Sequence, residues 1–149
     1  MGVPTVIIQG GIKVEAQLTT IANRLNRTDS ITGLDVWYKF QLKNIQYSKE
    51  RVTTVNGTQV SMGESFNILL PFTDRYIPYL QWKDLSNKDD YYTLSQGDYI
   101  FLTDITEDIQ PNTIMQIKNR YKGYVCEVRS IIEVPKRNGA TIQLKVSGV

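Results

Sequence analysis

The chain has 149 residues, 41% of them hydrophobic and 21% charged, with 17 basic and 15 acidic side chains. These values suit a single globular domain spanning 1–149 and exclude wholesale disorder. The near balance of charge argues against general nucleic-acid binding, although it leaves room for a local basic loop. Nine tyrosines beside four phenylalanines and two tryptophans favour strands, because aromatic side chains fit pleated sheets.

The residues on which most catalytic and metal sites depend are missing or rare. The chain contains no histidine and a single cysteine, Cys126. It therefore lacks the commonest general base, cannot hold a Ser-His-Asp or Cys-His arrangement, and cannot form an internal disulfide. No phosphate-binding glycine loop is present either. We predict no enzymatic activity, no metal and no cofactor, a reducing compartment, and Cys126 as a small core residue.

Carboxylate catalysis and membrane insertion also receive little support from the sequence. The dense acidic clusters are Asp89-Asp90 and the set Asp104, Glu107 and Asp108. Neither has the spacing of a calcium-binding loop, so we interpret both as solvated turns and rank a paired-carboxylate hydrolase last. No secretory signal is visible, and no run reaches the roughly 20 apolar residues of a transmembrane helix. We therefore expect no membrane association.

The first predicted elements are an extended N-terminal arm, residues 1–11, and an ambiguous segment after it. Thr5–Gln9 within the arm reads as a short strand. In the next segment, apolar residues follow the spacing of an amphipathic helix, at Val14, Leu18, Ile21, Ala22 and Leu25. The β-branched run Thr19-Thr20-Ile21 favours a strand instead. The polar stretch 26–33 then predicts a loop.

A strand and a hairpin are predicted next. Alternating side chains over Val36–Leu42 predict a strand with one face buried, followed by a kink at Asn44. Asn56-Gly57 is a strong hairpin signal, because both residues tolerate the positive φ of a type I′ turn. The small β-branched residues around this tip can bury little area. We therefore expect the Arg51–Val60 ribbon to project from the body or to lie along a partner.

The C-terminal half predicts further short strands about ten residues apart. Prolines around Ile77–Trp82 predict an edge strand or an irregular crossing, and Ile114–Arg120 suits either a helix or a strand. The remaining strands are expected at Ser65–Leu70, Tyr99–Leu102, Tyr124–Val134 and Thr141–Val146, the last two forming a hairpin across Asn138-Gly139. Together these elements predict a mainly β fold, a small barrel or sandwich with a protruding hairpin and at most one short helix.

Several short motifs also resemble a known family. Within Phe66–Phe101 they are Ile68-Leu69-Leu70-Pro71, Tyr76 and Tyr79, Trp82, Thr93-Leu94 and Gly97-Asp98-Tyr99-Ile100. This order resembles the small neck, or head-closure, proteins of tailed bacteriophages of Gram-positive bacteria. Ile21-Ala22-Asn23-Arg24 followed by Trp37-Tyr38-Lys39 is similar to the N-terminal hairpin of that family, which favours a strand for Leu18–Leu25. One departure is the end of the chain, Leu144–Val149, where related chains often carry a His-Trp pair.

The resemblance implies a virion structural protein of the phage neck, assembled in the cytoplasm of a bacterial host. Such head-closure proteins form a homo-oligomeric ring below the portal and adaptor, retain the packaged DNA and dock the tail. The implied partners are further copies of the chain, a portal or adaptor protein, and a tail terminator or tail protein. Function would then come from repeated interfaces around a closed rotational axis.

Two groups of residues are candidate contacts in that setting. A hairpin facing the channel or a neighbouring subunit would comprise Lys49, Arg51, Thr54, Val55, Asn56, Gly57 and Thr58. Lys49 and Arg51 could meet packaged DNA through its phosphates, without reading its sequence. The alternative is an ordinary exposed hairpin. Tyr76, Tyr79 and Trp82 are candidate interface aromatics, with plain core packing as the alternative.

Two other functions remain open. A tail terminator or tail-tube-like subunit would also use a small β fold with a long hairpin. A nucleic-acid-binding module of the OB type would use aromatic strand residues as a stacking platform, the obvious ones being Tyr38, Phe40 and Tyr47. The near-neutral net charge counts against this second function.

Overall fold

The computed structural model of the chain describes residues 5–9, 13–28, 35–135 and 138–149. The strands are β1 (Thr5–Gln9), β2 (Lys13–Thr28), β3 (Asp35–Asn56), β4 (Gln59–Pro71), β5 (Tyr99–Phe101), β6 (Val125–Pro135) and β7 (Thr141–Gly148). The helices are α1 (Tyr79–Trp82) and α2 (Ile114–Arg120), with a 3₁₀ turn, η1 (Lys88–Asp90), between them. Parts of the predicted arm 1–11, of the predicted loop 26–33 and of the turn before Asn138 lie outside the described residues.

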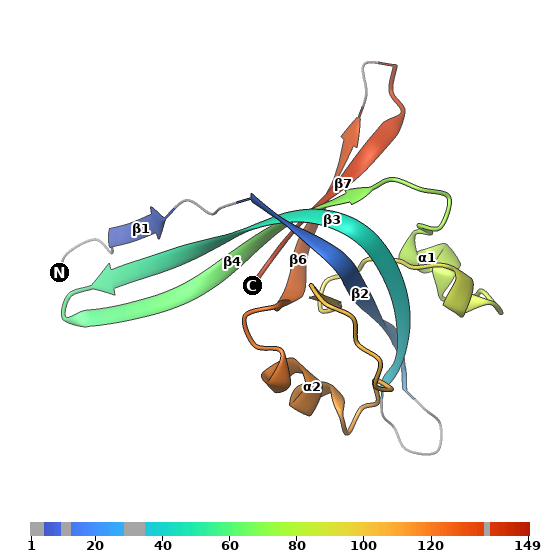
Figure 1. Ribbon diagram of the computed structural model, residues 1–149, viewed down its shortest axis with the longest axis horizontal. Coiled ribbons are helices and arrows are strands. Elements are labelled where there is room, and N and C mark those ends of the chain that lie inside the picture. The colour runs from blue at the N-terminus through green and yellow to red at the C-terminus, as the bar shows by residue number, and fades with distance from the viewer. Residues whose placement is uncertain (1–4, 10–12, 29–34, 136–137) are drawn as a thin grey trace.

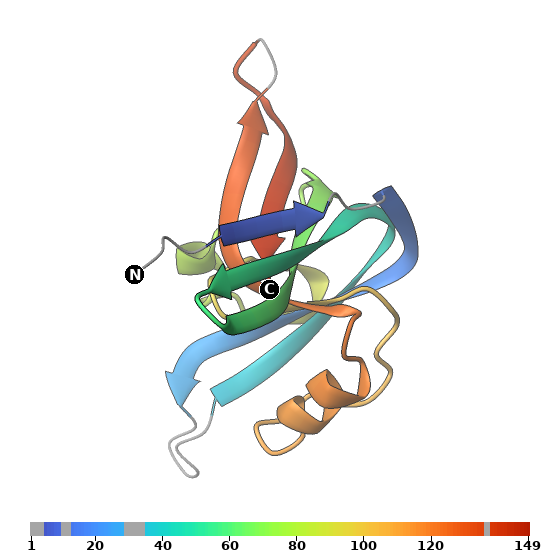
Figure 2. The ribbon, with the colours of Figure 1, turned by 90° about the vertical axis from the view of Figure 1, so that its left-hand side faces the viewer.

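Six of these strands close into an antiparallel barrel (Figures 1 and 2). Around the barrel, β2 pairs with β3, β3 with β4, β4 with β7, β7 with β6, β6 with β5, and β5 with β2. Closure leaves no free sheet edge along the paired part of each strand. The predicted mainly β fold, a small barrel with a protruding hairpin, is therefore confirmed.

The ambiguous segment after the N-terminal arm is a strand, β2, as the resemblance and its β-branched run favoured. At one place along β2 and β3, the side chains that point into the barrel shift from one face of the strand to the other. Inward side chains step from Ala16 to Thr19 in β2 and from Leu42 to Ile45 in β3, and these residues pair across the ladder. Asn44 lies within this step with a φ of 57°, which confirms the predicted kink. The kink is visible as the strong bend of β3 in Figure 1.

Two apolar clusters form the core. The first fills the barrel and comprises Ala16, Ile21, Ile45, Phe66, Ile68, Leu70, Tyr92, Leu94, Ile100, Leu102, Cys126, Val128, Leu144 and Val146. The second lies on the outer face of β2, β5 and β6, where Ala22, Phe101 and Val125 pack with Ile105 and Ile109 of the segment before α2 and with Ile114 and Ile117 of α2. Cys126 is thus a buried core residue, as predicted.

A three-stranded arm extends from the barrel. Arg51–Asn56 of β3 pairs with Gln59–Glu64 of β4 on one side and with Thr5–Gln9 of β1 on the other. We call the three-stranded ribbon formed by these residues the arm. In the view of Figure 1 it projects well beyond the barrel, in agreement with the predicted projecting ribbon.

Two local predictions need correction. Asn56 pairs with Gln59, so the central turn residues are Gly57 and Thr58 rather than Asn56 and Gly57. Only Gly57 has a positive φ, 62°, which is the sign pattern of a type II′ turn and not of type I′. For Ile77–Trp82 only the edge-strand alternative is wrong, because Tyr79–Trp82 forms the single helical turn α1 after Pro78. Proline suits the start of a helical turn, where its missing N–H costs nothing.

Candidate functional site: the arm and the groove at its base

The arm carries most of the predicted contact hairpin, and its described side chains lie outside the two core clusters. Among residues 51–64 whose side chains are described, none is buried, and Val60 is 63% exposed. The tip is formed by Val55, Asn56, Gly57 and Thr58, while the side chain of Thr54 lies outside the described residues. The arm therefore depends on backbone pairing, which by itself makes a ribbon only marginally stable in water.

Lys49 and Arg51, predicted together at the base of the hairpin, have different surroundings. The Lys49 ammonium lies 3.0 Å from a carboxylate oxygen of Glu64, donates to the Gly123 carbonyl at 3.2 Å, and lies over the Phe66 ring. Arg51 is exposed and has no ion pair among the described residues. Lys49 therefore ties the arm to the loop before β6, and Arg51 is the one of the two that can meet a phosphate.

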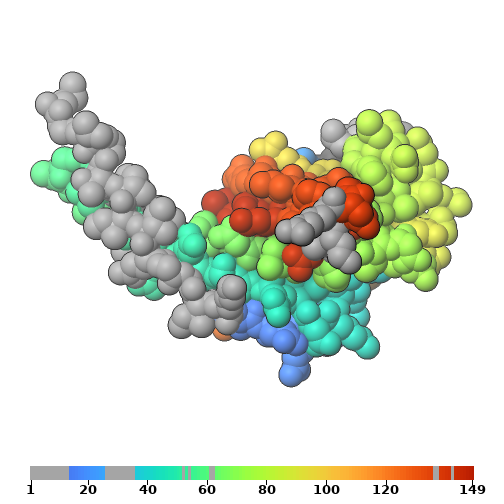
Figure 3. Space-filling model, turned by 90° about the horizontal axis from the view of Figure 1, so that it is seen from above, coloured from blue at the N-terminus to red at the C-terminus, as the bar shows by residue number. Residues whose placement is uncertain are grey.

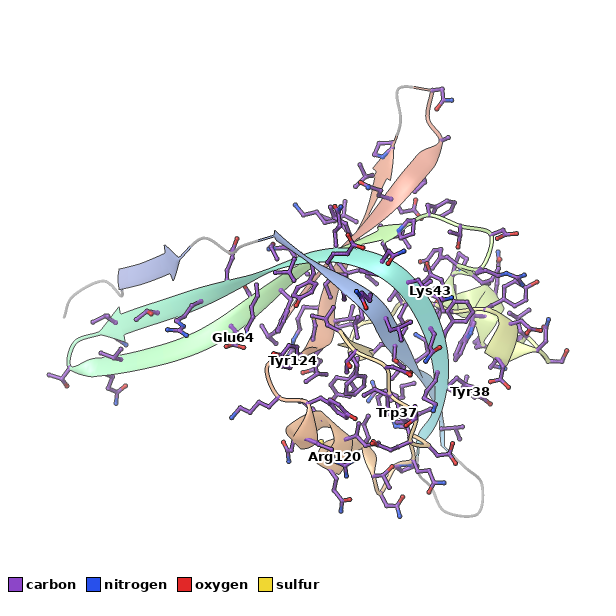
Figure 4. All side chains as sticks on the ribbon, viewed as in Figure 1. Trp37, Tyr38, Lys43, Glu64, Arg120 and Tyr124 are labelled. Carbon is purple, nitrogen blue, oxygen red and sulfur yellow. The ribbon has the colours of Figure 1, made fainter. Side chains whose placement is uncertain are left out.

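An open groove of about 710 Å³ lies where the base of the arm meets α2 and the start of β6. We call it the arm groove. It is lined by Arg51, Gly63, Glu64, Phe66, Lys118, Asn119, Lys122, Gly123, Val125, Glu127 and Val149. Tyr124, which is 57% exposed, lies between two lining residues. Figure 4 shows Glu64 on the arm and Tyr124 below it.

The arm groove combines an apolar floor with unpaired positive charge. Phe66 and Val125 are buried at the floor. Both lining glutamates already have cationic partners, Glu64 with Lys49 and Glu127 with Arg129 at 3.2 Å. Arg51 and Lys122 line the groove exposed and without a carboxylate partner among the described residues, while Lys118, also without a carboxylate partner there, lies over the Tyr99 ring at 5.1 Å. An apolar segment with acidic neighbours would complement such a surface.

The three candidate interface aromatics gather around α1. Trp82 is fully buried, and its ring meets the Tyr38 ring edge-on with 5.5 Å between centroids. Tyr79 packs on Trp82 at 6.1 Å and Tyr76 on Tyr92 at 5.7 Å. The burial of Trp82 favours core packing for that residue, while Tyr76 and Tyr79 are only half-buried.

The surface from Tyr79 to Asp90, which we call the α1–η1 surface, presents an apolar side chain amid acids. Leu80 on α1 is 74% exposed. Lys88 turns inward, since its ammonium donates to the Leu85 carbonyl at 2.6 Å and lies over the rings of Tyr38 and Trp82. The acids are exposed and have no ion pair among the described residues; they are Asp84, Asp89 and Asp90.

Asp98 has a structural role that the sequence analysis did not predict. Its buried carboxylate accepts hydrogen bonds from the backbone N–H groups of Arg24 and Ser95, each at 2.9 Å, and from the Asn23 amide at 3.0 Å. The Asn23 amide also pairs with the backbone of Thr93. Burial raises the pKa of Asp98 to about 6, against the lowering effect of these hydrogen bonds. Asp98 thus fastens the 93–98 segment to β2.

The residues of the alternative functions lie apart from the arm groove. Glu107 forms an ion pair with Arg120 at 2.8 Å, and Asp104 accepts a hydrogen bond from Gln41. Tyr38 packs on Trp82, and the Phe40 ring lies 5.0 Å from that of Tyr92, so two of the three platform aromatics contact rings of the chain itself. Tyr47 lines a separate recess of about 270 Å³ with Gln46, Ser48, Asn67, Leu69 and Lys145.

The comparisons with known proteins give a family without an assigned function. Among the described residues, no cluster of three or more acidic, cysteine or histidine side chains could hold a metal ion. None of the described helices has the length and apolar character to cross a bilayer. No curated protein and no solved structure matches the chain. Residues 15–149 match the family of unknown function DUF6751, and the chain therefore belongs to that family.

Proposed function

We propose that this protein is a virion structural protein of the neck of a tailed bacteriophage, acting in head closure. In this proposal several copies form a ring below the portal and adaptor, retain the packaged DNA and present a docking surface to the tail. The motif order between Phe66 and Phe101 is one source of support. The role requires shaped surfaces rather than a reaction, and the arm and the arm groove are such surfaces.

The arm is the observation that carries the proposal. Its strands continue those of the barrel for six paired residues of β3, Arg51–Asn56, a length of about 20 Å. Among the described residues, Gln59–Glu64 pairs only with β3, and so does β1, so both outer edges offer free backbone groups. A long projecting ribbon with open edges gains stability when a partner covers it, as happens repeatedly in a ring of copies.

Contact with packaged DNA would be made by charge and would not depend on base sequence. Arg51 is exposed at the base of the arm without an ion pair among the described residues, whereas Lys49 is engaged by Glu64. Because phosphate contacts release counterions, binding through Arg51 would weaken steeply as salt rises. We therefore assign any DNA contact at the arm base to Arg51 and assign Lys49 to holding the arm in place.

The proposal is tested by electron microscopy of the purified chain, alone and mixed with portal–adaptor complexes of tailed bacteriophages of Gram-positive bacteria. We expect ring-shaped density below the adaptor and, in virions labelled with antibody against the chain, label at the neck. Binding to tail tubes without binding to portal complexes would replace head closure by the tail-terminator alternative. Salt-sensitive binding of single-stranded oligonucleotides by the isolated chain, with no binding to either phage complex, would favour the OB-type alternative.

A further inference from the structure

Two surfaces of the chain match each other but cannot meet within one copy. The arm groove lies at the base of the arm, and α1 projects from the opposite side of the barrel (Figures 1 and 3). We propose that the arm groove of one copy receives the α1–η1 surface of a second copy. This inference rests on the proposed ring, and it assigns the contact that would join neighbouring subunits.

The receiving surface is built for an apolar group with acidic neighbours. Its floor is apolar at Phe66 and Val125, which are both buried. Its two glutamates are neutralised by Lys49 and Arg129. Its three cations, Arg51, Lys118 and Lys122, have no carboxylate partner among the described residues, and the Lys118 ammonium lies over the Tyr99 ring at 5.1 Å. The arm groove as a whole therefore attracts negatively charged groups.

The entering surface has the complementary properties. Leu80 has the highest exposed fraction, 74%, among the exposed large hydrophobic residues of the described chain. The same segment carries three exposed carboxylates without ion pairs among the described residues, those of Asp84, Asp89 and Asp90. The inward turn of Lys88 leaves Lys83 as the one exposed cation of this surface. Leu80 can thus enter the floor while the carboxylates face Lys118 and Lys122, which leaves Arg51 for the DNA contact assigned to it above.

The positions of the arm groove and the α1–η1 surface determine whether the contact between copies is head-to-head or head-to-tail. Because they are different patches on opposite sides of the barrel, the contact is head-to-tail. A head-to-tail contact repeats from copy to copy and closes into a ring when the rotation between neighbours allows it. The same contact would bring each arm base, with its Arg51, to an equivalent position around the axis.

Charge reversal on each surface tests the contact. One variant, Lys118→Glu with Lys122→Glu, makes the groove acidic; the other, Asp89→Lys with Asp90→Lys, makes the α1–η1 surface basic. Each variant alone then sets like charges against each other, and we expect its self-association to weaken by at least about tenfold. A mixture of the two variants has opposite charges at both contacts, so assembly should return.

The measurements are light scattering and native mass spectrometry, for the chain alone and with portal–adaptor complexes. The matched control is Lys43→Glu with Lys145→Glu, two exposed lysines that do not line the arm groove, and it should assemble like the wild type. Single variants that assemble as well as the wild type, or a mixture that does not recover, would overturn the contact while leaving the neck function standing. A wild-type chain that stays monomeric in both settings would overturn the contact and the ring together.

The apolar part of the contact is tested separately. Leu80→Ala should weaken self-association without lowering the melting temperature, because Leu80 is exposed in the single copy. Val14→Ala is the control, since Val14 is also exposed, at 43%, and lies on β2. Equal association of the two variants would remove Leu80 from the interface.

Discussion

At the scale of single residues, the most demanding position is Asp98. Three N–H donors from Arg24, Ser95 and Asn23 converge on a carboxylate that is almost completely buried. These donors belong to β2 and to the segment before β5, so one side chain joins two parts of the chain that are about 75 residues apart. A buried carboxylate that satisfies several donors holds local structure, since its removal leaves each donor without a partner.

We predict that Asp98→Asn lowers the free energy of unfolding by about 1–3 kcal/mol. The amide that replaces one carboxylate oxygen is itself a donor and would face an N–H group. Urea unfolding followed by circular dichroism measures the loss. Asp89→Asn makes the same chemical change at an exposed site on η1 and should cost less than about 0.5 kcal/mol. Equal stability of the two variants would show that the Asp98 hydrogen bonds contribute nothing.

The same carboxyl should make stability depend on pH. Burial raises the pKa of Asp98 from 3.8 to about 6 in the folded chain. Between these two pH values the folded state binds the proton more tightly than the unfolded state, so the free energy of unfolding falls as pH rises through this window and levels off above it. A pKa difference of this size corresponds to roughly 3 kcal/mol.

Unfolding free energies at intervals between pH 3.5 and pH 7.5, for the wild type and for Asp98→Asn, isolate this contribution. The difference between the two curves should change across the window and be flat outside it. A difference that stays constant from end to end would mean that the Asp98 pKa is the same in the folded and unfolded states.

At the scale of elements, β2 shows why its sequence has helical spacing and yet folds as a strand. Ile21 faces the barrel interior, and Ala22 faces the second cluster under α2, so both faces of this strand are buried. The shift of face between Ala16 and Thr19 then breaks the two-residue alternation. Two buried faces and one shift together produce an apolar pattern close to that of a helix, which periodicity alone cannot distinguish.

The Gly57-Thr58 turn and helix α1 were harder to predict than β2 for a different reason. Asn56-Gly57 and Gly57-Thr58 both suit a two-residue hairpin, and the choice depends on the register that β1 and β4 impose on β3. In Ile77–Trp82, the aromatic residues have strand character locally, but Trp82 is buried against Tyr38 from β3. Such contacts between distant segments are invisible to local patterns, whereas the Asn44 kink and the C-terminal hairpin depend on local signals and were predicted.

Gly148 provides a sharp test of how closely the barrel strands pack. It is buried and pairs with Phe66 on one side and Val128 on the other. An added Cβ would collide with the Glu127 carbonyl and the Cys126 sulfur. We predict that Gly148→Ala lowers the free energy of unfolding by about 3 kcal/mol or prevents folding.

The control for this substitution is Gly63→Ala on β4, where an added Cβ meets open space. It should change the free energy of unfolding by less than about 0.5 kcal/mol. Thermal and urea unfolding of both variants provide the comparison. A Gly148→Ala chain as stable as Gly63→Ala would mean that β6 and β7 can move apart freely at this point.

At the scale of the whole molecule, stability should be divided unevenly between barrel and arm. Phe66–Leu70 of β4 belongs to the closed barrel, while Gln59–Glu64 of the same strand pairs with β3 alone. We predict fast backbone amide exchange for Gln59–Glu64 and slow exchange for Phe66–Leu70 in the single copy. Hydrogen–deuterium exchange with mass spectrometry measures both segments in one experiment.

Assembly should change the difference in backbone amide exchange between the arm and the barrel. If a neighbour covers the arm in a ring, Gln59–Glu64 becomes protected while the barrel amides stay as they are. Exchange that is equally slow for both segments before assembly would show that the arm is stable without a partner. Exchange at the arm that assembly leaves unchanged would place the subunit contacts elsewhere.

The candidate site was predictable in part. The projecting hairpin and its basic base follow from Asn56-Gly57 and the lysine and arginine before it. The arm groove could not be predicted, because it joins the arm to α2 and the start of β6, about 60 residues further along the chain. The same limitation applies to Lys49 and Arg51, whose different roles depend on Glu64 and Gly123.

The continuity of β3 has a mechanical consequence. This strand runs for 22 residues from the barrel into the arm, and its sequence contains neither glycine nor proline. Strand β3 therefore has no residue of these two types between the barrel and the arm. The orientation of the arm is then fixed by the orientation of the barrel. A load on the tip would be transmitted along the backbone into the β2–β3 ladder. Tilting of one subunit would then displace its tip by an amount proportional to the length of the arm.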